Sequence, residues 1–232
     1  MKDLFGKALL DYQNGNYTVD LITSTNISDD DALPLPYLFR SFKDMPKLEQ
    51  HALKLSKGNI LDVGCGSGSH TLYLQDKGLQ VKAIDISEGA ITVCKQRGVL
   101  NAELKGLLDE TETFDTILLL MNGTGIFQTV KQVSTYLTHL KSLLNTNGKI
   151  LIDSSDIQYM YLDEDGGFWQ DINANYYGEL DYFLSYKNKK EDPIKWLYLD
   201  FNLLLTACQA VGLKCEMLAE GEHYDYLAKI SV

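Results

Sequence analysis

Positive charge is scarce in this sequence. Its 232 residues include 21 lysines and arginines against 32 aspartates and glutamates, which gives a formal net charge of -11. Proteins that bind nucleic acid neutralise phosphates with clustered basic side chains. The densest basic cluster, at residues 187–190, is followed at once by Glu191 and Asp192, which indicates a charged hairpin tip. We therefore expect no nucleic-acid partner.

Long apolar runs are also lacking. No segment approaches the roughly 18 apolar residues that a helix needs to cross a bilayer. No apolar stretch resembling a signal peptide follows Lys2 and Asp3. The sequence therefore predicts a cytoplasmic protein without a membrane partner.

Cysteine is rare, and its spacing supports neither cross-links nor a metal site. The cysteines, which show neither paired nor metal-ligand spacing, are Cys65, Cys94, Cys208 and Cys215. We expect reduced thiols, as in cytosolic proteins, and no bound metal. Nothing in the sequence indicates the oligomeric state.

What is present is a strand, a glycine turn and a helix at residues 60–78. Ile60, Leu61 and Val63 form a short apolar run, as expected for a strand buried on both faces. Glycines follow at alternate positions, and a helix-length segment then ends at Gly78. Glycine permits a tight turn and lets a ligand approach the backbone. The pattern predicts a binding site above the carboxyl end of this strand.

A second strand-like run ends in an acid. Residues 81–85 are followed by Ile86 and Ser87, and Asp85 lies 21 residues after Gly64. In nucleotide-binding folds a carboxylate at about this offset, roughly 20 residues, meets the ribose hydroxyls. Asp85 is therefore a candidate ligand of a sugar.

Together these residues resemble the cofactor site of class I S-adenosylmethionine-dependent methyltransferases. The resemblance rests on Asp62, on the glycines at 64, 66 and 68, and on Asp85-Ile86-Ser87. The dinucleotide fingerprint places a third glycine where this chain has Ser69. A Rossmann-like oxidoreductase that uses another nucleotide is the alternative within the same fold.

The resemblance implies a role for each matching residue. Asp62 would position the turn and the cofactor's ammonium, Asp85 would hold the ribose hydroxyls, and Ile86 would pack on adenine. The other positions implied in cofactor binding are Gly64, Cys65, Gly66, Gly68, His70, Asn122 and Gly123. His70 lies just inside a helix, where a structural or solvated side chain is the competing interpretation. Which residue of the segment 106–109 meets the adenine amine stays open.

The whole chain predicts an α/β fold with a Rossmann-like, doubly wound sheet, mostly parallel and closed by a C-terminal antiparallel hairpin. We expect one methyltransferase domain in four segments: an N-terminal helical cap (1–56), a cofactor-binding core (57–153), an antiparallel insertion or lid (154–198), and a helix with terminal strands (199–232). The insertion contains seven tyrosines together with Phe168, Trp169, Phe183 and Trp196. Residues 28–31, Ser-Asp-Asp-Asp, are predicted as a solvated loop.

Finer elements follow from periodicity and capping residues. Helices are expected over 1–16, from Pro46 to Leu55, after Ser87, over 129–145 and after Asp200. Strands are expected near 102–107 and over 117–121, 149–153, 178–187, 194–199, 213–218 and 224–230.

Methyl transfer needs an aligned nucleophile and exclusion of water more than a catalytic side chain. No catalytic residue is obligatory, and the candidates are Asp153, His223 and Arg40. Arg40 could clamp a carboxylate of cofactor or substrate, or be a surface ion-pair partner. His139 fits a structural or solvated side chain. The function expected is S-adenosylmethionine-dependent methylation of a small molecule; the alternatives are a non-catalytic cofactor-binding module and the oxidoreductase.

Overall fold

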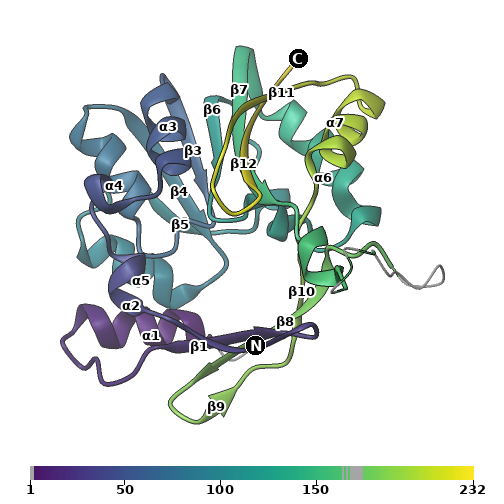
Figure 1. Cartoon of the computed structure of the whole chain (residues 1–232). Helices are drawn as coiled ribbons and strands as arrows, with labels where there is room; N and C mark the ends of the chain where they lie inside the picture. The colour runs from purple at the N-terminus through teal and green to yellow at the C-terminus, as the bar shows by residue number, and fades with distance from the viewer. Residues whose placement is uncertain (1–2, 164, 166, 168–174) are drawn as a thin grey trace.

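The computed structural model describes residues 3–163, 165, 167 and 175–232 and contains two β-sheets (Figure 1). The larger, here called the main sheet, has seven strands in the order β11-β12-β7-β6-β3-β4-β5. The smaller, here called the second sheet, has the order β10-β8-β1-β2, with β9 paired to β8. Phe168 and Trp169, two predicted aromatic residues of the insertion, lie outside the described residues.

The main sheet is doubly wound and mostly parallel, as predicted. Its parallel strands are β3 (Asn59–Val63), β4 (Gln80–Asp85), β5 (Ala102–Leu104), β6 (Phe114–Leu119) and β7 (Leu144–Ser155). The predicted hairpin of β11 (Lys214–Glu220) and β12 (Asp225–Ser231) adds two antiparallel strands at the β7 edge. The apolar run of β6 lies between β3 and β7, where both of its faces are buried.

Helices cover both faces of the main sheet. α3 (Lys47–Leu55), α4 (Ser69–Asp76) and α5 (Glu88–Gln96) pack on one face, and α6 (Val130–Ser142) and α7 (Phe201–Ala210) on the other. Ser87 and Asp200 are N-caps, as predicted, because their side chains accept from the backbone N–H of Ala90 and Leu203. The 3-10 turns are η1 (Phe42–Asp44), η2 (Leu107–Asp109), η3 (Gly123–Phe127) and η4 (Gln158–Tyr161).

The second sheet joins the N-terminal segment to the insertion. Its strands are β1 (Leu21–Thr25), β2 (Ser28–Leu33), β8 (Glu179–Tyr186), β9 (Lys189–Lys190) and β10 (Ile194–Leu197). The predicted antiparallel pairing of β8 with β10 is confirmed. The predicted loop at 28–31 is wrong, since these residues lie in β2 and pair with β1. β2 is an edge strand whose acidic side chains are exposed, so it shows no apolar alternation.

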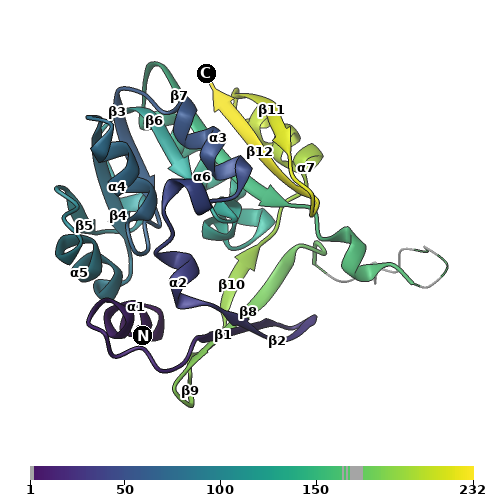
Figure 2. The same cartoon turned by 60° about the vertical axis from the view of Figure 1, so that its left-hand side comes forward.

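The first two helices pack in one cluster with α5. α1 (Leu4–Gln13) begins after Asp3 and crosses α5 so closely that a Cβ on Gly89 would lie 2.4 Å from a backbone carbon of Gly6 (Figure 2). α2 (Leu35–Leu38) follows the β1–β2 hairpin. The segment expected as a helical cap therefore also carries two strands.

The second sheet lies across the carboxyl ends of the parallel strands (Figure 1). Trp196 on β10 packs against Gly125 in η3, where an added Cβ would lie 2.1 Å from the indole ring. In open α/β sheets, ligands bind at this carboxyl edge. The second sheet thus covers the edge at which a functional site is expected.

In the part of the chain that the structure describes, no helix has both the length and the apolar character to span a membrane. Within the same residues, no group of three or more His, Cys, Asp or Glu side chains could hold a metal ion.

Candidate functional site

The glycine turn follows β3 with left-handed backbone at each glycine. The φ angles are 70° at Gly64, 53° at Gly66 and 82° at Gly68, a region that other residues enter only at a cost. Gly68 also lets α5 approach, since a Cβ there would lie 2.9 Å from Sγ of Cys94. At Gly66 the nearest atom to an added Cβ is on Phe5, at 3.7 Å. The turn therefore presents bare backbone with space above it.

Asp85 ends β4 directly beside this turn. Its Oδ2 accepts from the N–H of Gly66 and its Oδ1 from the N–H of Ser87, both at 2.9 Å. Burial raises the pKa of this carboxyl, although the two backbone hydrogen bonds oppose the shift. Each carboxylate oxygen has a second lone pair, so Asp85 can accept two further hydrogen bonds.

The residue that follows Asp85 has an exposed apolar side chain. Ile86 is 77% exposed although it is large and aliphatic. Gly106 lies close to both Ile86 and Asp109. A Cβ added at Gly106 would lie 3.9 Å from Ile86 Cγ2 and 3.0 Å from Asp109 Oδ2. The structure thus brings Asp109 opposite Ile86, in the segment where the sequence left the adenine partner open. The feature that singles out Asp109 within this segment is the turn η2, which ends at Asp109.

Behind the turn, Arg40, Glu49 and His70 form a buried charged cluster. Nη2 of Arg40 lies 2.5 Å from Glu49 Oε1, and Nε2 of His70 lies 2.7 Å from Glu49 Oε2. Burial raises the pKa of Glu49, but His70 and Arg40 outweigh it and hold that pKa below its ordinary value. Burial lowers the pKa of His70, but Glu49 and Asp62 outweigh it and raise that pKa. Of the alternatives left open, a surface ion pair does not hold for Arg40, whose ion pair is buried, and a solvated side chain does not hold for His70.

One atom of this cluster has no partner. Among the described residues, Nε of Arg40 is buried without a hydrogen bond, and a buried donor left unsatisfied costs about 1–3 kcal/mol. The Arg40 guanidinium also lies 3.9 Å from the ring centroid of Tyr37. Glu49 and Tyr37 were missed in the sequence, although Glu49 adjoins the apolar face of α3 formed by Leu48 and Ala52.

Asp62 on β3 is almost completely buried and accepts a hydrogen bond from Oγ1 of Thr71 on α4. Burial raises the pKa of Asp62, while His70 and Thr71 oppose the shift. The side chain thus lies under the glycine turn and fastens α4 to the strand.

Asp153 lies near the end of β7 and is held by the loop after β6. Its Oδ2 accepts from the N–H of Met121 at 3.0 Å and its Oδ1 from the N–H of Gly123 at 2.9 Å. Burial is the main cause that raises the pKa of Asp153 to about 6, and Glu49 adds to it, whereas the backbone hydrogen bonds and His70 oppose it. The left-handed backbone of Met121 and Asn122 shapes this cradle.

The Asn122 side chain faces the second sheet. Its Nδ2 donates to the carbonyl of Leu197 at 3.3 Å, and its Oδ1 accepts from Ser154 at 3.0 Å. Asn122 therefore ties the loop after β6 to the end of β10 and to β7.

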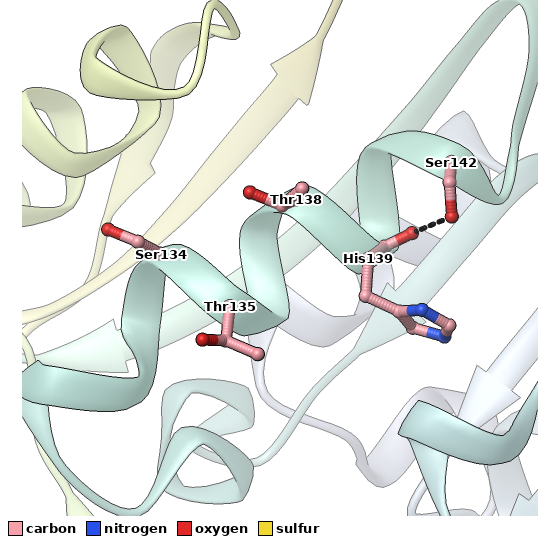
Figure 3. A pocket seen from close by; sticks show the side chains of 5 residues that line it. All are labelled: Ser134, Thr135, Thr138, His139 and Ser142. Carbon is pink, nitrogen blue, oxygen red and sulfur yellow. Dashed lines mark hydrogen bonds between the residues drawn. The ribbon is translucent and has the colours of Figure 1, made fainter.

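His139 and His223 lie outside this arrangement. His139 on α6 makes a 3.0 Å hydrogen bond to the carbonyl of Leu107. His139 borders a shallow hollow on α6 (Figure 3). The other side chains that line this hollow are exposed: Ser134, Thr135, Thr138 and Ser142. His223 is exposed in the turn between β11 and β12. Cys65 is buried in the glycine turn with its Sγ 3.7 Å from Sγ of Cys94, and Cys94, together with burial, raises the pKa of its thiol.

Comparison with known proteins assigns this chain to a family. A family model described as a methyltransferase domain matches residues 60–148. A crystal structure of a SAM-dependent methyltransferase from Bacteroides fragilis in complex with S-adenosyl-L-homocysteine is 45% identical to this chain. It covers 100% of this chain and 95% of its own, with a TM-score of 0.93.

More distant relatives match in part. The ubiquinone biosynthesis O-methyltransferase of Rickettsia felis is 30% identical over 115 residues, which are 47% of this chain and 46% of the relative. The chain spans about half the length of the curated relatives that it matches over this region. The CcbJ methyltransferase of Streptomyces caelestis, 12% identical with a TM-score of 0.62 over 81% of this chain and 97% of its own, shares the fold. The chain belongs to the SAM-dependent methyltransferases, whose cofactor is S-adenosylmethionine.

Proposed function

We propose that this protein transfers a methyl group from S-adenosylmethionine to a small molecule bound between the main sheet's carboxyl edge and the second sheet. When bound, the cofactor supplies a methyl group activated by the adjacent sulfonium. The observation that carries the proposal is the convergence, at one edge, of the bare glycine turn, the Asp85 carboxylate and the unsatisfied nitrogen of Arg40.

The residues fit the cofactor in two halves. On the nucleoside side, Asp85 would accept hydrogen bonds from the ribose hydroxyls, with Ile86 against the adenine face and Asp109 near its amine. The exposure of Ile86 supports this role, because burying a large exposed aliphatic side chain under a flat ring lowers the free energy of the complex.

On the amino-acid side, Nε of Arg40 would donate to the cofactor's carboxylate. Arg40 is 8% exposed and already held by Glu49, so its direction is fixed before a ligand arrives. Asp62 is the carboxylate that lies under the glycine turn, and the cofactor's ammonium would bind at that turn.

A small acceptor is favoured by what covers the site. The second sheet lies across the strand ends, and the loop after β6 is bonded to β10 through Asn122 and Thr124. The relative from Rickettsia felis is named for ubiquinone biosynthesis, which is consistent with a small acceptor. The net charge of -11 disfavours a nucleic-acid acceptor.

Calorimetry with S-adenosylhomocysteine tests the cofactor site. A charged hydrogen bond contributes about 1.5–3 kcal/mol, so Asp85→Ala should weaken binding by about tenfold or more. The control is Asp76→Ala, since Asp76 is exposed at the end of α4, and it should leave the affinity unchanged. Unchanged affinity in Asp85→Ala would remove Asp85 from this role. Binding of NAD(H) in place of S-adenosylhomocysteine would contradict the proposal, and binding without methyl transfer to any metabolite would indicate a non-catalytic module.

A further inference from the structure

The face of the second sheet that packs on α1, here called the inner face, carries aromatic rings. Leu184 and Tyr186 on β8 pack in a buried cluster with α1, and side chains alternate between faces along a strand. Tyr182 therefore lies on the same inner face, while Phe183 lies on the outer one. Trp196 on β10 is opposite Leu180 in the register, which places it on the inner face as well. Tyr182 and Trp196 are in contact, with ring centroids 5.6 Å apart.

Tyr198 extends this face to the Asp153 cradle. Its neighbours Leu197 and Leu199 are buried in the main core, so the Tyr198 side chain points the other way. The Leu197 carbonyl accepts from Asn122, and the Leu199 N–H donates to Ser154 Oγ at 2.9 Å. Asn122 lies within the loop that holds Asp153, and Ser154 follows Asp153 in sequence.

The Tyr198 hydroxyl lies among other tyrosines. Burial raises the pKa of Tyr198 to about 12, and Tyr182 and Tyr159 add to the shift. We call Tyr182, Trp196 and Tyr198 the aromatic wall.

Negative charge at this edge has no cationic partner. Among the described residues, the salt bridges include none of Asp62, Asp85 and Asp153. The charged groups that act on Asp153 are Glu49 on α3 and His70 on α4, which are bonded to each other. Arg40 is likewise bonded to Glu49. An anionic acceptor would meet carboxylates that form no salt bridge with any described residue here, whereas a group that becomes positive would be stabilised.

We propose that the methyl acceptor is an amine, held between the Asp153 carboxylate and the aromatic wall. This inference rests on the proposed function. During transfer, positive charge moves from the sulfur to the acceptor nitrogen, and both a carboxylate and aromatic faces stabilise charge that develops there.

The step balances in atoms and charge. The neutral amine donates its lone pair to the methyl carbon, the carbon–sulfur bond breaks, and its electron pair stays on the sulfur. An N–H proton then passes from the nitrogen to an Asp153 carboxylate oxygen. The products are the methylated amine, a neutral thioether and a protonated Asp153, which releases its proton to solvent.

Amine capping tests the acceptor class. A metabolite extract is incubated with the full-length protein and methyl-labelled S-adenosylmethionine, once untreated and once after acetylation of its amines. We expect acetylation to lower label transfer at least tenfold, and the label in the product of the untreated extract to survive mild base, which cleaves methyl esters. Transfer that survives acetylation, or a product whose label is on oxygen, carbon or sulfur, would overturn the amine inference and leave the proposed function standing. No transfer in either extract would refute the proposed function itself.

Matched variants test the wall and Asp153. With the untreated extract as acceptor, Tyr198→Leu and Asp153→Asn should each lower transfer at least tenfold and leave S-adenosylhomocysteine affinity within twofold. Phe183→Leu removes a ring from the outer face of the same sheet and should change neither quantity. Tyr198→Phe retains the ring and should retain most of the transfer. Full transfer in Tyr198→Leu or Asp153→Asn would refute the placement of the acceptor.

Discussion

Glu49→Gln should destabilise the fold strongly, because it removes the carboxylate that is bonded to both buried partners in the Arg40–Glu49–His70 cluster. Glu49 is 4% exposed and Arg40 8%, and both distances to Glu49 are 2.7 Å or less. Removing one partner of a buried ion pair costs about 3–5 kcal/mol. For chains of 150–250 residues, 1 kcal/mol shifts Tm by roughly 2–4 °C, so Tm should fall by about 6–20 °C.

The assay is urea unfolding at several pH values, followed by circular dichroism. Since the folded-state pKa of Glu49 is lowered, its stabilising contribution is present above its unfolded pKa and is lost as pH falls through the folded pKa. The difference between wild type and Glu49→Gln should therefore shrink in acid. The double variant Arg40→Met with Glu49→Met should recover most of the stability, because a well-packed apolar pair can replace a buried ion pair, but it should lose cofactor affinity. A difference in unfolding free energy below about 1 kcal/mol at pH 7 would refute the reasoning.

Three further predictions concern the site and its cover. If Asp153 is the proton acceptor, kcat/KM should fall about tenfold per pH unit below about 6, since its raised pKa is about 6; Asp153→Asn should abolish this acid limb, and an unchanged limb would assign it to another group. Gly89→Ala should push α1 off α5, because the new Cβ would lie 2.4 Å from a Gly6 backbone carbon; hydrogen exchange should then increase in α1, whereas Glu88→Ala on the same helix should leave it unchanged. Asp109→Ala should weaken S-adenosylhomocysteine binding by about 1–3 kcal/mol in calorimetry and leave Tm of the free protein unaffected; equal binding would exclude Asp109 as the adenine partner.

The main sheet and its cofactor turn were predictable because their signals are local. A glycine turn is encoded by the residues that adopt positive φ, and Ser87 and Asp200 cap helices three residues from the groups they bond. The order of strands and helices along 60–153 then fixed the topology through the right-handed crossover rule.

The second sheet and the charged cluster were not predictable, because they depend on how separate segments pack together. β1 pairs with β8, which lies more than 150 residues later, and β2 carries a run of exposed aspartates that is typical of a loop. Arg40 was singled out as a candidate, but its contact with Glu49 depends on how α3 packs beside α4. Only the assembled fold places Asp109 opposite Ile86.

The second sheet is built from two stretches that are far apart in the sequence, and this affects how fragments and chimaeras of this enzyme should be made. Because β1 and β2 come from the first 33 residues and β8 and β10 from 179–197, neither stretch completes its strand pairing without the other. A fragment cut to residues 60–148, the region that the family model matches, would lose Arg40, the aromatic wall and the part of β7 that carries Asp153. Domain swaps that aim to change acceptor choice should therefore exchange both stretches at once.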